Sequence, residues 1–292
     1  MASYDRDYAR EGMRRAGPPP MPPVTKWLLI LNVGIFLLDT FFFGSRIKLW
    51  GCFTVGSALA EFRIWEFITF QFIHDSVAHI LFNSLGIFFI GPFVERWWGS
   101  SLFIRFYLLC GAAGALFYSL LAAIGLIRGP EPFNTPLVGA SAGLFGLLVA
   151  VYVIAPQVRV RLLFPPIELS MKQLVTALMV ISVAVIGGAL LFPNFILFGN
   201  SGGEAGHLGG AIMGFVLMKF PWLIGQGKRE RKILRPKEFR RQGAPKLRPR
   251  TEVDLQKDTE VDRILDKISK HGPDSLTDEE REMLIEASKK DS

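Results

Sequence analysis

The sequence has very few charged residues over two thirds of its length. Residues 27–220 contain 18 of the 59 Asp, Glu, Lys and Arg residues in the 292-residue chain. A soluble globular domain carries about 25% charged residues. The low-charge block excludes a disordered chain and an ordinary soluble enzyme. It indicates a membrane protein with several spans and water-exposed ends.

Cysteine is also scarce, since the chain has only Cys52 and Cys110. They lie far apart and fit no metal-ligand spacing, so a disulfide scaffold is excluded and two unpaired, buried or interfacial thiols are predicted. The first 26 residues have no apolar stretch of the kind found in a cleavable signal peptide. Their PPPMPP motif favours an extended arm.

Six apolar segments are long enough to cross a membrane as helices, which predicts an all-α membrane bundle. They cover about residues 27–43, 77–94, 102–127, 137–155, 173–192 and 204–220. The stretch 44–76 mixes charge with Phe and Trp, as an interfacial or half-inserted element does.

Lys and Arg residues predict the orientation of these spans. They gather before the first span, in the second-to-third and fourth-to-fifth connections, and after the sixth span. By the positive-inside rule both termini are cytoplasmic. This gives a cytoplasmic arm (1–26), a six-helix membrane domain (27–220), a basic linker (221–250) and an acidic tail (251–292).

The two parts of the C-terminal region differ in charge. Residues 228–250 carry eleven Lys and Arg and two Glu, a net charge of +9, and directly follow a span. Contact with anionic lipid head groups is one interpretation, and plain charge retention on the cytoplasmic side is another. Nucleic-acid binding is not expected, because Phe239 is the only aromatic residue available for stacking.

Residues 251–292 have a net charge of −6 and predict a small soluble helical hairpin. Apolar residues at helical spacing precede a break at His271-Gly272-Pro273. Thr277 with Glu280 then predicts a capping box that opens a second helix.

Three of the four histidines lie at the predicted outer ends of spans. His79 and Asn83, at i and i+4, project from one face of the second span, and His74 lies in the turn before it. Ionisable groups at membrane depth are candidates for function. An interhelical hydrogen-bond clamp is the structural alternative for the His79–Asn83 pair.

His207 opens the sixth span and shares a face with Gly210 and Gly214, where small residues let a second helix approach closely. The best partner is the glycine-rich fourth span, which holds Ser141 near its outer end. Serine among small residues in a membrane helix is usually a packing residue. Beside a histidine it becomes a candidate nucleophile, because a neutral imidazole can take its proton.

The predicted topology supports this pairing. The second, fourth and sixth spans run in the same direction, so the groups in their first turns lie at similar depth. The Ser141 backbone N–H, His79 and Asn83 are then candidate donors to an oxyanion.

With these elements in this order, the sequence resembles the rhomboid intramembrane serine proteases. The matching segments are HDSVAHILFN (74–83), GASAG (139–143) and HLGGAIMG (207–214). Trp65, Glu95-Arg96 and Gly99 also match. The resemblance covers about residues 27–220.

The resemblance implies a six-helix bundle in which Ser141 is the nucleophile and His207 the general base, with no third carboxylate. His79 and Asn83 match the oxyanion-hole side chains. No metal or nucleotide is needed, and the partners are transmembrane segments of other proteins. The tail is similar to those of some bacterial rhomboids, which implies a bacterial inner membrane. Further residues expected to have structural roles near the site are His74, Gly139, Phe145, Gly210 and Gly214.

Three positions depart from the usual family pattern. Ala142 follows the serine where Gly is common, and Phe145 replaces a frequent Tyr, which leaves a ring to pack on the histidine. Trp65-Glu66 replaces a frequent Trp-Arg, which affects contacts within the loop. The loop before Trp65 and the fifth span are candidate gates for substrate.

Other functions fit less well. A non-catalytic relative that binds membrane clients has typically lost the Ser or the His, and both are present here. A transporter lacks support, since no inverted repeat or charged pathway is apparent. An intramembrane metalloprotease needs HExxH, which is absent, and an aspartyl type needs two membrane carboxylates with a glycine-aspartate motif, whereas Asp39 is the only Asp well inside a span.

Overall fold

The computed structural model describes two compact units, Met1–Phe239 and Arg240–Ser292. The described residues are 20–127, 131–162, 166–192, 195, 199–225, 261, 263–264, 266–272 and 275–290. Most of the predicted arm and the whole basic run 228–250 lie outside them.

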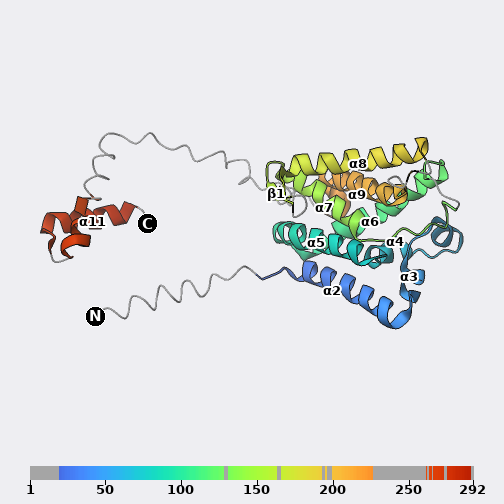
Figure 1. Cartoon of the computed structure of the whole chain (residues 1–292), viewed down its shortest axis with the longest axis horizontal. Helices are drawn as coiled ribbons and strands as arrows, with labels where there is room; N and C mark the ends of the chain where they lie inside the picture. The colour runs from blue at the N-terminus through green and yellow to red at the C-terminus, as the bar shows by residue number, and fades with distance from the viewer. Residues whose placement is uncertain are drawn as a thin grey trace. The chain divides into compact units, whose positions relative to one another are not determined.

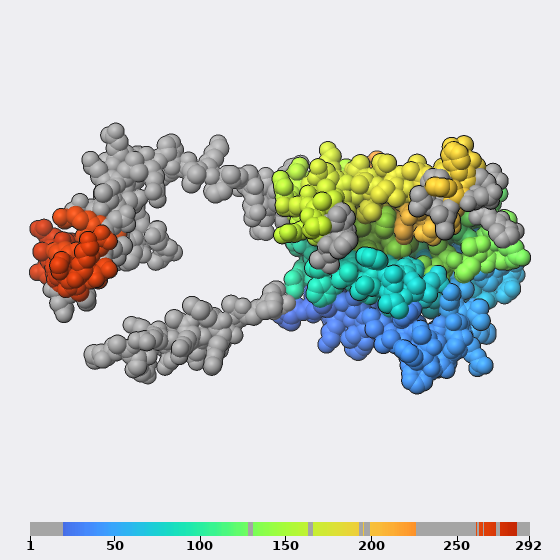
Figure 2. Space-filling view, viewed as in Figure 1, coloured from blue at the N-terminus to red at the C-terminus, as the bar shows by residue number. Residues whose placement is uncertain are grey.

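The first unit is a helical bundle in which α6, α7 and α9 form the centre and α2 and α8 lie on opposite flanks (Figure 1). On the face shown in Figure 2, the surface of α5 lies between those of α2 and α8. The apolar part of α6 is 61% buried, against 17% for α2 and 22% for α8, so the flanking helices expose broad apolar faces. The long helices are α2 (Pro23–Leu38), α5 (Val77–Trp98), α6 (Ser100–Ala123), α7 (Ser141–Ile154), α8 (Met171–Leu191) and α9 (Ser201–Lys219).

Among the described residues, four helices are long and apolar enough to cross a membrane. They are Pro23–Phe43, which joins α2 to a π-helical turn at Asp39–Phe43, together with α5, α6 and α8. α7 has only 14 residues, because residues 137–140 of the predicted fourth span are not helical. α9 is a helix of 19 residues with glycines, Glu204 and His207 in its first half. These four helices are candidate membrane spans by length and composition, and the count of six spans stays a prediction.

Buried polar contacts show which helix ends share one end of the bundle. Glu95, in the last turn of α5, accepts hydrogen bonds from the backbone N–H groups of Val24 (2.9 Å) and Thr25 (2.7 Å) at the start of α2. It also accepts one from Ser100 Oγ (2.6 Å) at the start of α6. The start of α5 therefore lies toward the opposite end, and contacts of His79 with Gly139 and of Ser141 with His207 place the starts of α7 and α9 there too.

The core of the bundle is aromatic around α6, where Phe103, Phe106 and Tyr107 are fully buried. Cys110 in this helix and Cys52 in the loop before α5 are free, buried thiols, as predicted. Burial raises the pKa of the Cys52 thiol.

The stretch 44–76 contains only short elements, namely α3 (Arg46–Gly51), a π-helical turn (Gly56–Ala60), α4 (Glu66–Thr69) and a 3-10 turn (Phe70–Phe72). Glu66 is fully buried and pairs with Arg63 Nε at 3.0 Å. The Arg63 guanidinium also lies over the rings of Trp50 and Trp65, at 5.2 and 5.6 Å. Position 66, where the family frequently has Arg, is Glu in this chain, and Arg63 places a cation beside Trp65 instead.

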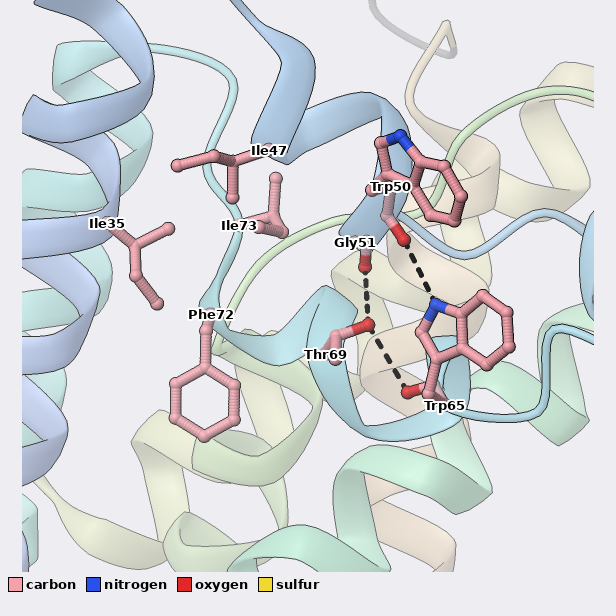
Figure 3. A pocket seen from close by; sticks show the side chains of 8 residues that line it. All are labelled: Ile35, Ile47, Trp50, Gly51, Trp65, Thr69, Phe72 and Ile73. Atoms are coloured by element: carbon pink, nitrogen blue, oxygen red, sulfur yellow. Dashed lines mark hydrogen bonds between the residues drawn. The ribbon is translucent and has the colours of Figure 1, made fainter. Parts of the chain in front are cut away.

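An apolar pocket of about 340 Å³ lies between α2 and this stretch (Figure 3). Two side chains close its rim by hydrogen bonds to the backbone of α3. Trp65 Nε1 donates to the Trp50 carbonyl at 3.2 Å, and Thr69 Oγ1 donates to the Gly51 carbonyl at 2.9 Å. These hydrogen bonds therefore fix α4 and Trp65 against α3.

α7 and α8 are joined by a short antiparallel hairpin of β1 (Arg159–Arg161) and β2 (Glu168–Ser170), paired Arg159↔Ser170 and Arg161↔Glu168. Ser170 and Gln173 form a capping box that starts α8. Basic residues of this hairpin lie at the same end of the bundle as the start of α8.

The second unit contains α11 (Asp278–Lys290) and helical residues between 261 and 271. The predicted capping box is present, because Thr277 N donates to Glu280 Oε2 (2.9 Å) and Glu280 N donates to Thr277 Oγ1 (3.3 Å). Lys267 bridges the two helices by its ion pair to Glu280 at 2.8 Å. The hydrogen bond from Lys267 is the main reason that the pKa of the Glu280 carboxyl lies below its usual range. The prediction of a helical hairpin is confirmed.

Candidate functional site

The loop before α7 places Ser141 at the first position of that helix. Gly139 has φ of +117°, which favours glycine, and its N–H donates to the Phe70 carbonyl at 2.9 Å. A Cβ at this position would also lie 2.6 Å from His79 Nε2. Glycine is therefore needed twice over at position 139, for the backbone turn and for the approach of the histidine.

The site's central contact joins α7 and α9, because His207 Nε2 lies 2.8 Å from Ser141 Oγ. Phe145, one turn after the serine, stacks on the His207 ring with centroids 4.1 Å apart and planes 13° apart. The Phe145 ring thus fixes the plane of the imidazole, and the contact with Ser141 fixes the direction of its Nε2 atom.

Glycines allow α7 and α9 to cross this closely. A Cβ at Gly210 would overlap the carbonyl oxygen of Ala142, and a Cβ at Gly214 would lie 2.8 Å from the Cα and the carbonyl oxygen of Gly146. Small residues at such crossings let membrane helices approach backbone to backbone. The two glycines lie on the same side of α9 as His207, so the close crossing brings His207 to Ser141.

A carboxylate lies on the other side of the histidine. Glu204 Oε2 is 3.0 Å from His207 Nδ1 and accepts a hydrogen bond from Ser182 Oγ of α8 at 2.5 Å. The resemblance implies a Ser–His dyad without a carboxylate as its third member, and the structure departs from that expectation because Glu204 contacts His207. The signal was present in the sequence, since Glu204 precedes His207 by three residues and therefore shares its helix face.

Of the three groups predicted on and before α5, His79 and Asn83 lie beside the serine, and His74 packs against His79. His79 Nε2 faces the Gly139 backbone, and the buried Asn83 donates from Nδ2 to the His79 carbonyl at 3.0 Å. His74 is buried and packs edge-on against the His79 ring at 5.0 Å. Burial, assisted by the neighbouring His79, lowers the pKa of His74 to about 4, so this ring is neutral at pH 7.

A cavity of about 610 Å³ opens onto Ser141 and His207. Its apolar wall comes from α5, α7 and α8, and its polar residues come mainly from the starts of α5 and α9. The apolar lining includes Phe82, Leu144, Leu148, Leu178 and Ile181. Such a cavity can take an extended apolar peptide segment with its backbone near the serine.

No metal centre accompanies the site in the part of the chain that the structure describes, where no three His, Cys, Asp or Glu side chains are grouped to hold an ion. The chemistry available there is that of a hydroxyl, an imidazole, a carboxylate and amide donors.

Comparison with known proteins identifies the class. The family model described as the Rhomboid domain matches residues 61–222. The chain therefore belongs to the rhomboid family, and with its apolar helices it is an integral membrane protein. Residues 254–290 match a second model, a family of unknown function (DUF6576).

Several curated proteins are similar to this chain. Rhomboid protease GluP of Bacillus subtilis is 28% identical over 159 residues, which is 54% of this chain and 26% of that protein. RHOMBOID-like protein 12, mitochondrial, of Arabidopsis thaliana is 26% identical over 199 residues, covering 64% of this chain and 54% of that protein. Rhomboid protease AarA of Providencia stuartii is 26% identical over 209 residues, covering 66% and 70%. The match thus spans about a quarter and about half of the first two relatives.

Proposed function

We propose that this protein is an intramembrane serine endopeptidase that cleaves transmembrane segments of other proteins. The observation that carries the proposal is the 2.8 Å contact between Ser141 Oγ and His207 Nε2 in the lining of a cavity with a largely apolar wall. The protease names of similar rhomboids, GluP and AarA, support the same reaction class.

In the proposed reaction, Ser141 is the nucleophile and His207 the general base. His207 Nε2 takes the hydroxyl proton as Oγ forms a bond to the scissile carbonyl carbon, and the carbonyl π electrons move to oxygen. The tetrahedral intermediate then expels the amine, which receives the proton from Nε2, and leaves an acyl-serine. Water repeats the sequence, giving its proton to Nε2 and releasing the carboxyl product and free Ser141.

The oxyanion that forms in each step needs donors that are already in place. The Ser141 N–H is one, because the first N–H groups of a helix have no intrahelical acceptor and α7 has no side-chain cap. His79 and Asn83 line the cavity beside it and are the proposed side-chain donors. The positive end of the α7 dipole favours negative charge at the same place.

Access to the cavity is proposed along α8. A peptide in lipid keeps its helical hydrogen bonds, so a substrate has to unwind locally where water can enter. Leu178 and Ile181 of α8 line the cavity, while Val180 and Val183 of the same helix are 62% and 59% exposed. A helix so weakly covered can move aside more easily than the central helices. The loop before Trp65 is a second candidate gate.

The charge distribution favours cytoplasmic termini. Lys26, Arg96, Arg105 and Lys219 lie at the end of the bundle where α2 and α6 start and α5 and α9 end. By the positive-inside rule this end faces the cytoplasm, which places Ser141 toward the opposite face. A bacterial inner membrane and contact of residues 228–250 with anionic head groups remain parts of this proposal.

The experiment is cleavage of a single-span reporter protein by the full chain in proteoliposomes. We expect Ser141→Ala and His207→Ala each to abolish cleavage while the protein still inserts and unfolds at the wild-type temperature. Cleavage by either variant would overturn the assignment. Retained binding of the reporter without cleavage by the wild type would favour the alternative, a non-catalytic client-binding rhomboid.

A further inference from the structure

Glu204 connects the histidine of the site to helix α8. Its Oε2 atom lies 3.0 Å from His207 Nδ1 and 2.5 Å from Ser182 Oγ. The Glu204 side chain is 16% exposed and the His207 side chain 18%, so both lie largely out of water. Four side chains from three helices thus form one chain of hydrogen bonds, in the order Ser182, Glu204, His207 and Ser141.

The direction of these bonds follows from the chemistry of the groups. An ionised carboxylate can only accept hydrogen bonds. His207 Nδ1 therefore carries the hydrogen that points to Glu204, and Nε2 keeps the lone pair that faces the Ser141 hydroxyl. This is the tautomer that a general base needs, and the opposite tautomer would direct an N–H at the serine.

Ser182 holds the carboxylate in place. The buried residues of α8 are Met171, Val175, Ser182, Ile186 and Ala189, so Ser182 is the one polar side chain in an otherwise apolar stripe. It is fully buried, where a hydroxyl without a partner costs free energy. Its hydrogen bond to Glu204 satisfies the hydroxyl and fixes the rotamer of the carboxylate.

We propose that Glu204 is a positioning residue for His207, selecting its tautomer and stabilising the imidazolium that forms during acyl transfer. Ser182 supports Glu204 and ties the base to α8. The proposal rests on the proposed function, because positioning matters only if His207 is the base. Its consequence is that this rhomboid uses a Ser–His–Glu arrangement.

The test compares kcat and KM of the full chain in proteoliposomes with a single-span reporter. We expect Glu204→Gln to lower kcat by about 10²- to 10⁴-fold, the upper limit being the loss known when the third member of a serine triad becomes an amide. KM should stay within about twofold, since Glu204 acts through His207. Glu204→Asp, which keeps the charge, should recover at least tenfold of the loss, and Ser182→Ala should lower kcat less than tenfold.

Glu168→Gln is the matched control, because Glu168 is a half-exposed carboxylate of β2 outside the site. Its kcat should equal that of the wild type. If Glu204→Gln also keeps the wild-type kcat while Ser141→Ala is inactive, the positioning role fails and the proposed function stands. If Ser141→Ala still cleaves, the proposed function itself fails.

A measurement on the wild type keeps the test decisive if Glu204→Gln does not fold. Because the chain has four histidines, ¹⁵N-histidine spectra of the intact protein are tractable, with His207→Ala assigning the signal. We expect the His207 signal to show hydrogen on Nδ1, the nitrogen that faces Glu204. A ring with hydrogen on Nε2 would overturn the proposal, whatever the kinetics of the variants.

Discussion

The crossing of α7 and α9 sets the distance between the serine and the histidine, and Gly210→Ala tests this directly. Gly210 lies one turn after His207, and a Cβ there would overlap the carbonyl oxygen of Ala142. A backbone oxygen inside a helix cannot rotate away as a side chain does. The two helices must therefore move apart.

Gly214, one turn further along the same face, gives the size of the movement. A Cβ there would lie 2.8 Å from Gly146 Cα, and unstrained carbon contacts start near about 3.5 Å. A Cβ at Gly214 would thus open the crossing by about 0.7 Å, and the Cβ of Gly210→Ala would open it by more, because its overlap is deeper. The 2.8 Å contact between His207 Nε2 and Ser141 Oγ would then lengthen to about 3.5 Å or more, where hydrogen bonds are lost.

We expect Gly210→Ala to lower kcat by about 10²-fold, as a misplacement near 1 Å does, and to cost about 1–3 kcal/mol of stability through overpacking. Reporter cleavage and thermal unfolding in detergent measure the two effects. Gly187→Ala in α8 is the matched control, because a Cβ there meets nothing within 4 Å. Equal activity of the two alanine variants would refute the reasoning.

Three further perturbations have defined outcomes. Phe145→Ala should lower kcat by about tenfold, since an aromatic stack contributes about 0.5–1.5 kcal/mol, whereas Phe145→Tyr should cleave at the wild-type rate. Equal rates of reporter cleavage for the wild type and both variants would exclude a role for the ring. His74 has a pKa of about 4 when folded and a higher one when unfolded, so its contribution to stability should rise between about pH 4 and pH 6.5 by up to about 3 kcal/mol. Unfolding temperatures should rise less steeply over this range in His74→Gln than in the wild type, and equal slopes would contradict the burial of a neutral His74. Glu95→Gln should speed amide hydrogen exchange at Thr25 and cost about 1–3 kcal/mol, and unchanged exchange would show that the buried carboxylate does not hold α2.

The placement of the helices could be predicted because charge depletion and apolar length are properties of the sequence alone. The predicted fifth span, 173–192, differs from α8 by two residues at its start and one at its end. The fourth span failed at its outer end, where residues 137–140 are apolar yet not helical. Composition cannot distinguish an apolar helix from an apolar loop. The difference here lies in the backbone of Gly139, whose φ is +117°.

The pairing of His207 with Ser141 was predictable from the helix face that His207 shares with Gly210 and Gly214. The hydrogen bonds to Glu204 were not predicted, although Glu204 lies three residues before His207 on that face. The resemblance implied a site of two residues, Ser141 and His207. Ser182 could not have been chosen from the sequence, because only the packing of α8 on α9 shows which of its polar residues faces inward.

The loop 44–76 shows how a substitution is absorbed by its surroundings. Glu66 stands where an Arg is frequent, and the structure pairs it with Arg63, which lies over Trp50 and Trp65. The cation reaches the same tryptophan from a different position along the chain. Residue-by-residue comparison with a family pattern cannot detect such an exchange.

The central claim is that Ser141 is a nucleophile activated by His207. The most direct measurement is the intact mass of the full chain after treatment with a fluorophosphonate, followed by peptide mapping of the modified residue. The account predicts a single adduct on Ser141 that disappears in His207→Ala. An unmodified Ser141 in protein that cleaves the reporter, or equal labelling of Ser141 in the His207→Ala variant, would contradict it.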